Sequence, residues 1–443
     1  MQIKISDHFT LGRLFRYTAP TCVMMVFTSI YGVVDGLFVS NFVGKEPFAA
    51  LNLIYPMFMM LGSLGFMFGA GGTALVAKTM GEGDDERARG LFSFVVYVTL
   101  GVGVACGAIA LAIVRPVGAA FGATGSLLEE CVVYGSIISL SLPFFMLQQL
   151  FQSFLNAAGK PKVGLAVMVL AGVANIVLDA FFIVGLGWGL AGAAAATAVS
   201  EVLGGGIPLL YFARKNSSTL CLCRPLVDMR ALGRMCANGS SELVSNISMS
   251  LVSMLYNFQL MIFIGPDGVA VYGIIQYIAW IAISLLMGFA TGVSPIVSYH
   301  FGAKNTSELK GLFRKCLAVM AAGGVAICAI VHLLARPCAA IFVGYDAALC
   351  DMTVVALSEY SLAFVFVGVS IFGSAFFTAL NNGLVSAIIS FLRTLVFESA
   401  AVLLLPIVLG ADGIWYSIVV AEVASVVLTT GFLVALRKWY GYA

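Results

Sequence analysis

Four polar side chains interrupt long apolar stretches of this sequence: Asp35, Asn175, Asp179 and Thr197. Asn175 and Asp179 are four residues apart, a spacing that places their side chains on one face of a helix. Inside a membrane an ionisable group costs about 2.5–3.5 kcal/mol, so such residues are functional candidates. Hydrogen bonding between neighbouring helices is the simpler role that they could serve.

These residues carry two carboxylates, one amide and one hydroxyl. Desolvation and mutual repulsion disfavour two ionised carboxylates side by side, and a small cation relieves both effects. Oxygen ligands of this kind suit a proton or a hard cation such as Na⁺. The sequence therefore predicts a site whose occupancy by H⁺ or Na⁺ changes its charge.

Composition indicates that the elements positioning these groups are membrane-spanning helices. Hydrophobic residues make up 61% of the chain and charged residues 10%, whereas soluble domains have about 25% charged residues. A span needs roughly 20 apolar residues. Twelve such runs predict an all-α polytopic protein, at about 18–43, 48–77, 91–114, 131–156, 163–184, 189–212, 235–263, 268–298, 312–335, 353–379, 384–409 and 413–436.

The chain repeats one pattern at a constant offset: Gly81 returns as Gly302, and Glu201 as Glu422. We expect two six-helix lobes, residues 1–220 and 221–443, related by a pseudo-two-fold axis along the membrane normal. A cavity between the lobes and alternating access follow as expectations. The last helix of each half carries the repeated glutamate, which suggests a shared structural role.

Counting residues inward from the nearest glycine turns estimates how deep the polar groups lie. Asp35 is nine residues from Gly44, Asp179 eight from Gly187, and Thr197 ten from Gly187. At about 1.5 Å per residue these separations correspond to depths of roughly 12–15 Å. The predicted site residues can therefore meet inside the first bundle.

The repeat is not chemically symmetric. Tyr256 stands at the position equivalent to Asp35, and Ala400 at the position equivalent to Asp179. The second half therefore lacks the matching carboxylates. Four further glutamates within its spans are read as stabilising or cavity-rim residues rather than coupling sites: Glu242, Glu359, Glu398 and Glu422.

Other residues of the first helix have predicted roles in movement and substrate binding. Pro20 lies fifteen residues before Asp35, and a proline within a helix frees a carbonyl and permits a kink. It is a candidate hinge, with a static kink as the alternative. Flexible thioethers and aromatic rings suit apolar or cationic ligands, and the candidate cavity residues are Met24, Met25, Phe27, Tyr31 and Tyr256.

Together, these motifs resemble the multidrug and toxic compound extrusion (MATE) family, in its DinF-type branch with the MepA-like bacterial exporters. The resemblance covers essentially the whole chain. It implies a twelve-helix exporter of lipophilic, often cationic drugs in exchange for H⁺ or Na⁺. By that resemblance, the cation site comprises Asp35, Asn175, Asp179 and Thr197, and Pro20 is the bending point.

Charge and composition favour a cell-membrane protein with both termini in the cytoplasm. Of the 23 Lys and Arg residues, nineteen fall on the side of the N-terminus; Lys45, Arg115 and Arg336 fall opposite and Arg393 near a helix end, a strong bias under the positive-inside rule. The first apolar run is read as a true span rather than a leader. We expect no cofactor, no resident metal, no nucleic-acid partner and a monomer.

Two other functions remain open from the sequence. A flippase for lipid-linked precursors could share this architecture, although it would be expected to line its cavity with several basic residues. A membrane-embedded enzyme is the remoter possibility. The three histidines, His8, His300 and His332, lie near helix ends or outside the spans, and the scattered cysteines suggest neither a zinc site nor a disulfide framework.

Overall fold

The structure is a computed structural model that describes residues 3–214, 216–344 and 346–442, with the backbone alone at positions 37, 40, 41, 45, 46 and 266. Lys215 and the side chain of Lys45, both counted in the charge bias, thus lie outside the described part. The first half comprises α1 (Leu11–Phe38), α2 (Lys45–Gly81), α3 (Asp85–Ala120), α4 (Gly125–Ala157), α5 (Pro161–Asp179) and α6 (Gly189–Ala213). Two π-helical segments, η1 (Val39–Val43) and η2 (Ala180–Gly185), extend α1 and α5.

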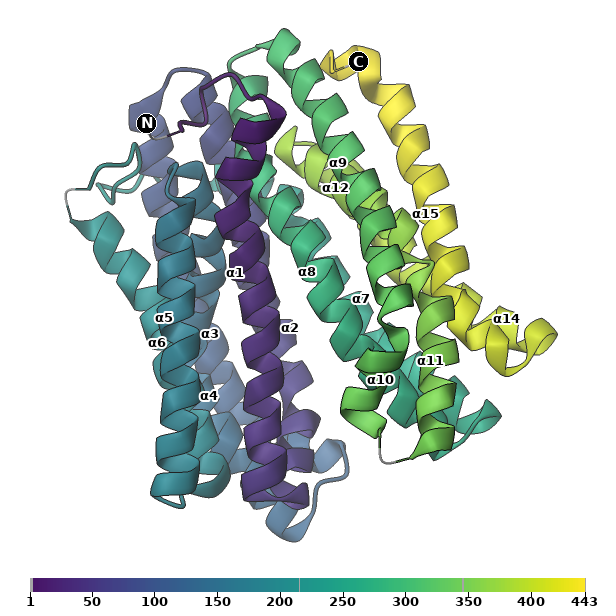
Figure 1. The fold of residues 1–443 in the computed structure, drawn as a ribbon. Coiled ribbons are helices and arrows are strands. Elements are labelled where there is room, and N and C mark those ends of the chain that lie inside the picture. Colours follow the sequence, from purple (N-terminus) through teal and green to yellow (C-terminus); the bar gives the residue numbers. More distant parts are fainter. Residues whose placement is uncertain (1–2, 215, 345, 443) are drawn as a thin grey trace.

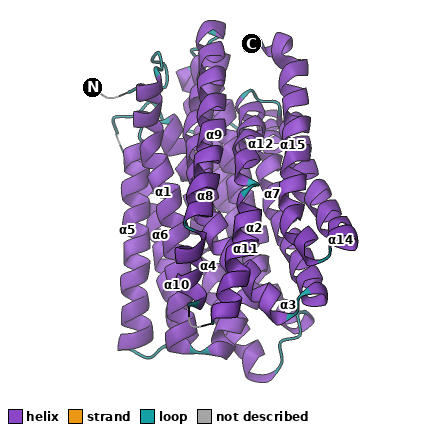
Figure 2. Ribbon diagram, turned by 45° about the vertical axis from the view of Figure 1, so that its right-hand side comes forward, coloured by secondary structure: helices purple, strands orange, loops and turns teal. Residues whose placement is uncertain are grey.

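The second half is divided into more pieces. It comprises α7 (Met229–Phe263), α8 (Pro266–Gly302), α9 (Thr306–Leu333), α10 (Ala335–Val343), α11 (Ala347–Ser361), α12 (Phe364–Ala379), α13 (Gly383–Ser390), η3 (Phe391–Phe397), α14 (Glu398–Leu409) and α15 (Ala411–Tyr440). Figure 1 shows α1–α6 on the left and the elements of the second half on the right, with both termini at the top. The described residues contain no strand (Figure 2).

The helices agree with the predicted number of spans. Among the described residues, eleven helices are long and apolar enough to cross a membrane, and α11 with α12 supplies a twelfth as one span bent by 45°. The all-α polytopic fold is confirmed. The segment from η3 through α14 belongs to the span that begins with α13.

Serine hydroxyls bond to backbone carbonyls just before the bend between α11 and α12, which the apolar pattern did not reveal. Ser358 Oγ donates to Val354 O and Ser361 Oγ donates to Ser358 O, both at 2.7 Å. Hydroxyl bonds to carbonyls of the preceding turn compete with the backbone ladder and bend helices. Two of them in succession stand directly before the break.

Glycines bring the helices of the two halves into backbone contact. A Cβ atom on Gly81 would lie 2.0 Å from Tyr299 O, and one on Gly302 would lie 2.0 Å from Lys78 O. The two contacts are reciprocal, because Tyr299 and Gly302 are the repeat counterparts of Lys78 and Gly81. Deeper along α2, a Cβ on Gly71 would lie 1.9 Å from Met235 O on α7.

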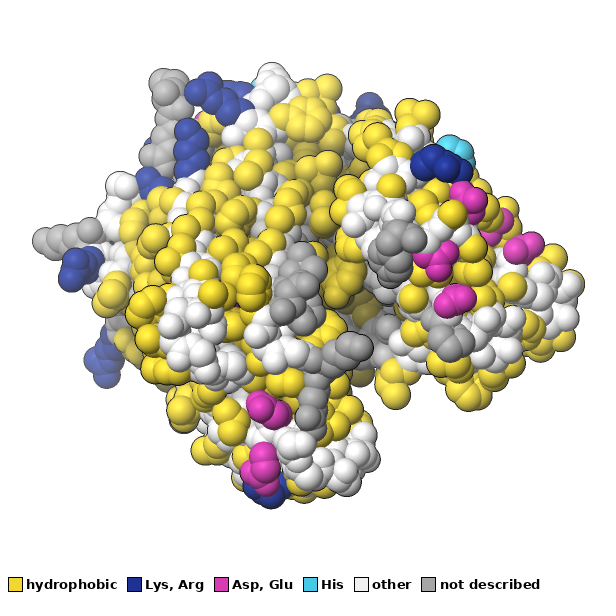
Figure 3. Space-filling view, turned by 60° about the horizontal axis from the view of Figure 1, so that its bottom comes forward, with side chains coloured by type: hydrophobic (Ala, Val, Ile, Leu, Met, Phe, Trp, Pro, Cys, Tyr) yellow, Lys and Arg dark blue, Asp and Glu magenta, His cyan; other side chains and the backbone are white. Residues whose placement is uncertain are grey.

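The N-terminal segment adds polar contacts across the halves at the end that carries both termini. Glu308 of α9 accepts the Phe9 backbone N–H at 2.9 Å and pairs with His8 at 2.5 Å. Lys315 Nζ donates to Phe9 O at 2.5 Å. Seen toward the opposite end, the surface is hollowed between the two groups of helices (Figure 3). The halves are therefore closed at the end with the termini.

Candidate cation-binding site

The two aspartates of the predicted site stand where regular α-helix gives way to π-helix. The backbone N–H of Val39, the first residue of η1, donates to the carbonyls of Asp35 and Gly36. Asp179 is the last residue of α5, and η2 follows at once. Single π-helical turns within helices are frequent at functional sites, because they alter which side chains face a neighbour.

The predicted site residues come together inside the first bundle. Asp35 on α1 and Asp179 on α5 lie close enough for their carboxyl groups to interact electrostatically. One turn away on α5, Asn175 Nδ2 donates to Thr197 Oγ1 of α6 at 3.5 Å. Asn175 and Asp179 are buried, with 1% and 0% of their surfaces exposed. Three helices thus supply the four side chains that depth counting expected to meet.

The site is rich in oxygens that accept hydrogen bonds and poor in donors. Oδ1 of Asp35, Oδ1 of Asn175 and both carboxylate oxygens of Asp179 are buried without a hydrogen-bond partner. A buried acceptor that lacks a donor costs about 1–3 kcal/mol, and more when it is charged. A proton, or a cation coordinated by these oxygens, would remove that cost. Chemically, the arrangement can therefore bind a small positive ion.

The candidate hinge and cavity residues of α1 pack mainly toward the interior of the first bundle. Pro20 is buried within α1, which continues as a helix on both sides of it. Met24 is 1% exposed. The rings of Phe27 and Tyr31 lie 6.1 Å apart and cover Gly172 of α5. Met25, by contrast, is partly exposed.

Tyr256, which occupies the position equivalent to Asp35, lies in the core of the second half. Its ring is fully buried and stacks on Tyr272 at 4.8 Å, and its hydroxyl has no partner. Glu398 lies nearby and interacts with this ring and with Glu422. In the described conformation these groups form a buried polar cluster rather than the lining of an open cavity.

Sequence reasoning missed an ion pair in this cluster. Nε and Nη2 of Arg393 each lie 2.8 Å from Oε1 of Glu422. Arg393 belongs to η3 and Glu422 to α15. The only signal in the sequence was an arginine within an apolar run. Glu201 is the repeat counterpart of Glu422 but has different neighbours. The shared structural role that we predicted for these two glutamates therefore does not involve equivalent partners.

Comparison with known proteins decides the family. The model of the MatE family matches residues 20–181 and 243–401, most of the chain. The chain belongs to the MatE family. The predicted resemblance is confirmed, and this MATE protein is a multi-pass membrane protein of a family of multidrug exporters.

Curated relatives of this MATE protein include the multidrug export protein MepA of Staphylococcus haemolyticus strain JCSC1435, 27% identical over 73% of this chain and 71% of that protein. The MepA protein of Staphylococcus aureus strain MRSA252 is 24% identical over 92% of this chain and 90% of that protein.

Solved structures of MATE proteins share the fold. A MATE protein in complex with MaL6 has a TM-score of 0.91 at 23% identity, covering 97% of this chain and 98% of the other. An outward-facing MATE transporter of the MOP superfamily has a TM-score of 0.91 at 24% identity and the same coverage.

Proposed function

We propose that this MATE protein is a cation-coupled antiporter that exports lipophilic, often cationic, compounds by alternating access. H⁺ or Na⁺ is the coupling ion, and it binds at Asp35, Asn175, Asp179 and Thr197. The observation that supports this most directly is the set of buried oxygens without donors on Asp35, Asn175 and Asp179. The MepA relatives are named multidrug export proteins, which supports the same direction and class of cargo.

Binding of one ion changes the charge of a site that water cannot screen. With the ion absent, two carboxylates repel each other across the contact between α1 and α5. With it present, the helices can approach. An ion entering down the membrane potential supplies about 2.3 kcal/mol per 100 mV, which corresponds to roughly fifty-fold in concentration ratio. One ion per cycle is enough to drive useful export.

Alternating access requires the contacts between the halves to separate at the end with the termini. Pro20 is the proposed bending point, since its ring leaves one α1 carbonyl without the usual N–H donor. In this proposal a monomer with lobes 1–220 and 221–443 lies in the bacterial cytoplasmic membrane with both termini inside. No prosthetic group takes part.

The test is uptake of a fluorescent lipophilic cation, added to the outside of inverted membrane vesicles, whose outer face is the cytoplasmic side of the membrane. We expect wild-type transport to collapse with an uncoupler if H⁺ is the coupling ion, or on removal of Na⁺ if Na⁺ is the coupling ion. Asp35→Asn is expected to abolish it while the protein still inserts. The matched control is Asp85→Asn, because Asp85 is exposed in the first turn of α3. Full transport in Asp35→Asn would refute the assigned role. Separate pH jumps and Na⁺ jumps with purified protein in liposomes identify the ion.

A further inference from the structure

The linker between α6 and α7, residues 216–228, is fastened to the first half. Cys223 N donates to Ser93 Oγ of α3 at 2.9 Å. Leu226 N donates to Gly90 O of the same helix at 3.0 Å. Figure 1 places this linker at the end of the molecule that carries both termini. The backbone bonds fix which side of the linker faces α3 and which faces outward.

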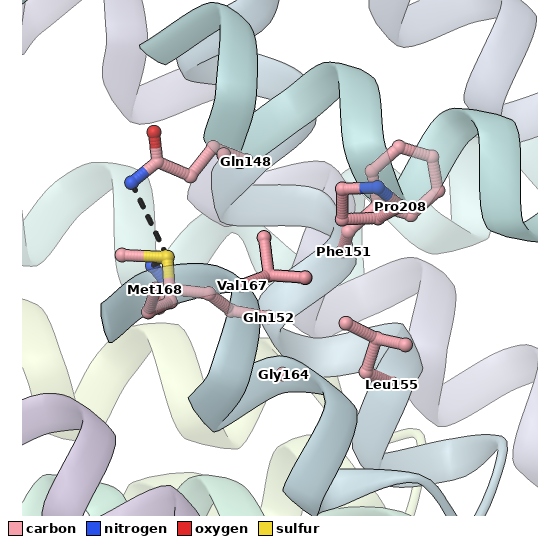
Figure 4. A pocket seen from close by; sticks show the side chains of 9 residues that line it. Gln148, Phe151, Gln152, Leu155, Gly164, Val167, Met168 and Pro208 are labelled. Atoms are coloured by element: carbon pink, nitrogen blue, oxygen red, sulfur yellow. Dashed lines mark hydrogen bonds between the residues drawn. The ribbon is translucent and has the colours of Figure 1, made fainter. Parts of the chain in front are cut away.

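The inner side of the linker joins the packed interior of the first bundle. Leu220 is fully buried, and Leu222 N donates to Phe212 O of α6 at 2.8 Å. The Phe212 ring lies 4.9 Å from that of Phe92 and stacks on Phe151 at 5.6 Å. Phe151 in turn lines a small pocket between α4, α5 and α6 (Figure 4). The linker is therefore part of the first bundle rather than a loose tether.

Three apolar side chains stay outside, around the start of α7. Leu226 is 42% exposed, Val227 65% and Met229 67%. Single exposed apolar residues are ordinary on a protein surface, whereas a contiguous group of them indicates an interaction surface. These three are almost consecutive in a segment whose backbone is held in place.

The length of α7 places this surface at the edge of the bilayer. The helix has 35 residues, which at about 1.5 Å per residue make it about 52 Å long. The hydrocarbon core of a bilayer is only about 30 Å thick. The first turns of α7 therefore extend beyond the acyl chains and lie among the lipid headgroups.

Three arginines beside the apolar side chains have no ion-pair partner. Arg224, Arg230 and Arg234 are exposed, and in the described part of the chain no carboxylate pairs with them. Asp228, the one carboxylate in this stretch of sequence, caps α7 and lies 3.8 Å from Arg87. The surface therefore combines apolar side chains with positive charge that the protein does not neutralise.

The linker patch is defined as these six exposed residues: Arg224, Leu226, Val227, Met229, Arg230 and Arg234. We propose that the linker patch binds an anionic phospholipid of the inner leaflet. Guanidinium groups donate charge-assisted hydrogen bonds to phosphate oxygens, and basic residues next to a membrane attract anionic lipids. The apolar side chains lie at the boundary between headgroups and acyl chains, as those of interfacial helices do.

This inference does not depend on the transported compound or on the coupling ion. The proposed orientation, with both termini inside, serves only to name the leaflet. Because the linker is docked on the first half and α7 belongs to the second, the bound lipid would contact both halves where the chain passes between them.

The corresponding end of α9 offers a matched control. Lys310 and Arg314 are exposed and four residues apart, as Arg230 and Arg234 are on α7. Their apolar neighbour Leu309 is only 1% exposed. This pair therefore carries the same charge without the exposed apolar side chains.

The experiment uses purified full-length protein carrying Val227→Trp in vesicles of phosphatidylcholine with a rising fraction of phosphatidylglycerol. In parallel series, one or the other lipid carries bromine on its acyl chains, and bromine quenches a tryptophan that it contacts. The quenching measured for wild type, which reports the four native tryptophans, is subtracted. Comparison of the series gives the relative affinity of the linker patch for the two lipids.

Each arginine at an anionic membrane surface contributes about fivefold to binding. We therefore expect the three arginines together to give a preference for phosphatidylglycerol of roughly 100-fold. Arg230→Gln/Arg234→Gln, added to Val227→Trp, should lower this preference to about fivefold. Lys310→Gln/Arg314→Gln in the same background should leave it unchanged.

Three results would overturn the proposal. The first is a preference below about twofold with Val227→Trp alone, and the second is an unchanged preference after Arg230→Gln/Arg234→Gln. The third is a lack of quenching by either lipid, which would place the linker patch in water, as expected of a surface for a soluble partner. No ion gradient enters the measurement, so failure of the antiport proposal would not alter its outcome.

Discussion

Gly71 provides a direct way to perturb the closed arrangement of the two halves. A Cβ atom at this position would lie 1.9 Å from Met235 O and 2.7 Å from the backbone N of Gly239, both on α7. Ordinary contact begins at 3.4 Å, so both atoms are far too close for alanine to fit at position 71. Because the obstructing atoms belong to the backbone, no side-chain rotation can relieve the clash. The helices α2 and α7 must separate instead.

Overpacking of this kind costs about 1–3 kcal/mol. Since the cost falls on the state in which α2 and α7 touch, Gly71→Ala is expected to shift the equilibrium away from closure by about 5- to 150-fold. Local opening exposes backbone N–H groups to exchange with solvent. Hydrogen–deuterium exchange by mass spectrometry is therefore expected to quicken in residues 64–78 and 230–245.

The matched control is Gly101→Ala on α3, where a Cβ meets nothing within 4 Å. Alanine within an open helix position gains up to about 1 kcal/mol of helix propensity, so this variant should keep or improve protection. Gly239→Ala supplies the reciprocal perturbation, with a Cβ 2.0 Å from Met67 O. Wild-type protection of both segments in Gly71→Ala would refute the idea that this backbone contact holds the halves together.

Two further predictions concern single electrostatic contacts. Arg393→Gln leaves Glu422 buried without its cation and should destabilise the protein by about 3–5 kcal/mol, whereas Arg393→Gln/Glu422→Gln should recover most of that loss. Thermal unfolding in detergent compares the two variants. Equal melting temperatures would contradict the prediction. The backbone N–H of Ala231 is the main reason why the pKa of Asp228 is lower than usual. Asp228 caps α7, so its contribution is present at neutral pH and is lost only as the pH falls through that lowered value. Amide exchange in the first turn of α7 should therefore be unchanged between pH 7 and 5 once corrected for intrinsic rates, and should increase in Asp228→Ala at pH 7.

Hydropathy and depth counting were sufficient for the fold and for the proximity of Asp35 and Asp179. Both depend on position along a helix axis, which residue counting measures well in spans of nearly constant length. Asn175 and Thr197 followed from the same argument, and the structure joins them by a hydrogen bond. Their role in ion coupling stays a prediction until transport is measured.

The sequence could not show how each helix is rotated about its own axis. Regular spacing cannot show a π-helical segment such as η3, which alters the face that following residues present. That segment contains Arg393 and ends directly before Glu398. The pairing of Arg393 with Glu422 and the packing of Tyr31 over Gly172 depend on such rotations. Neither leaves a periodic signal in one sequence.

The reciprocal contact between Gly81 and Gly302 has a consequence for the origin of this protein. Gly81 faces the carbonyl of Tyr299. Gly302 faces the carbonyl of Lys78, which is the repeat counterpart of Tyr299. A contact of that form must straddle the pseudo-two-fold axis, as self-complementary patches do in symmetric dimers. It is thus the interface that two identical six-helix ancestors would have shared before their genes fused. The unequal chemistry of Glu201 and Glu422 then arose afterwards, as the joined copies became free to diverge.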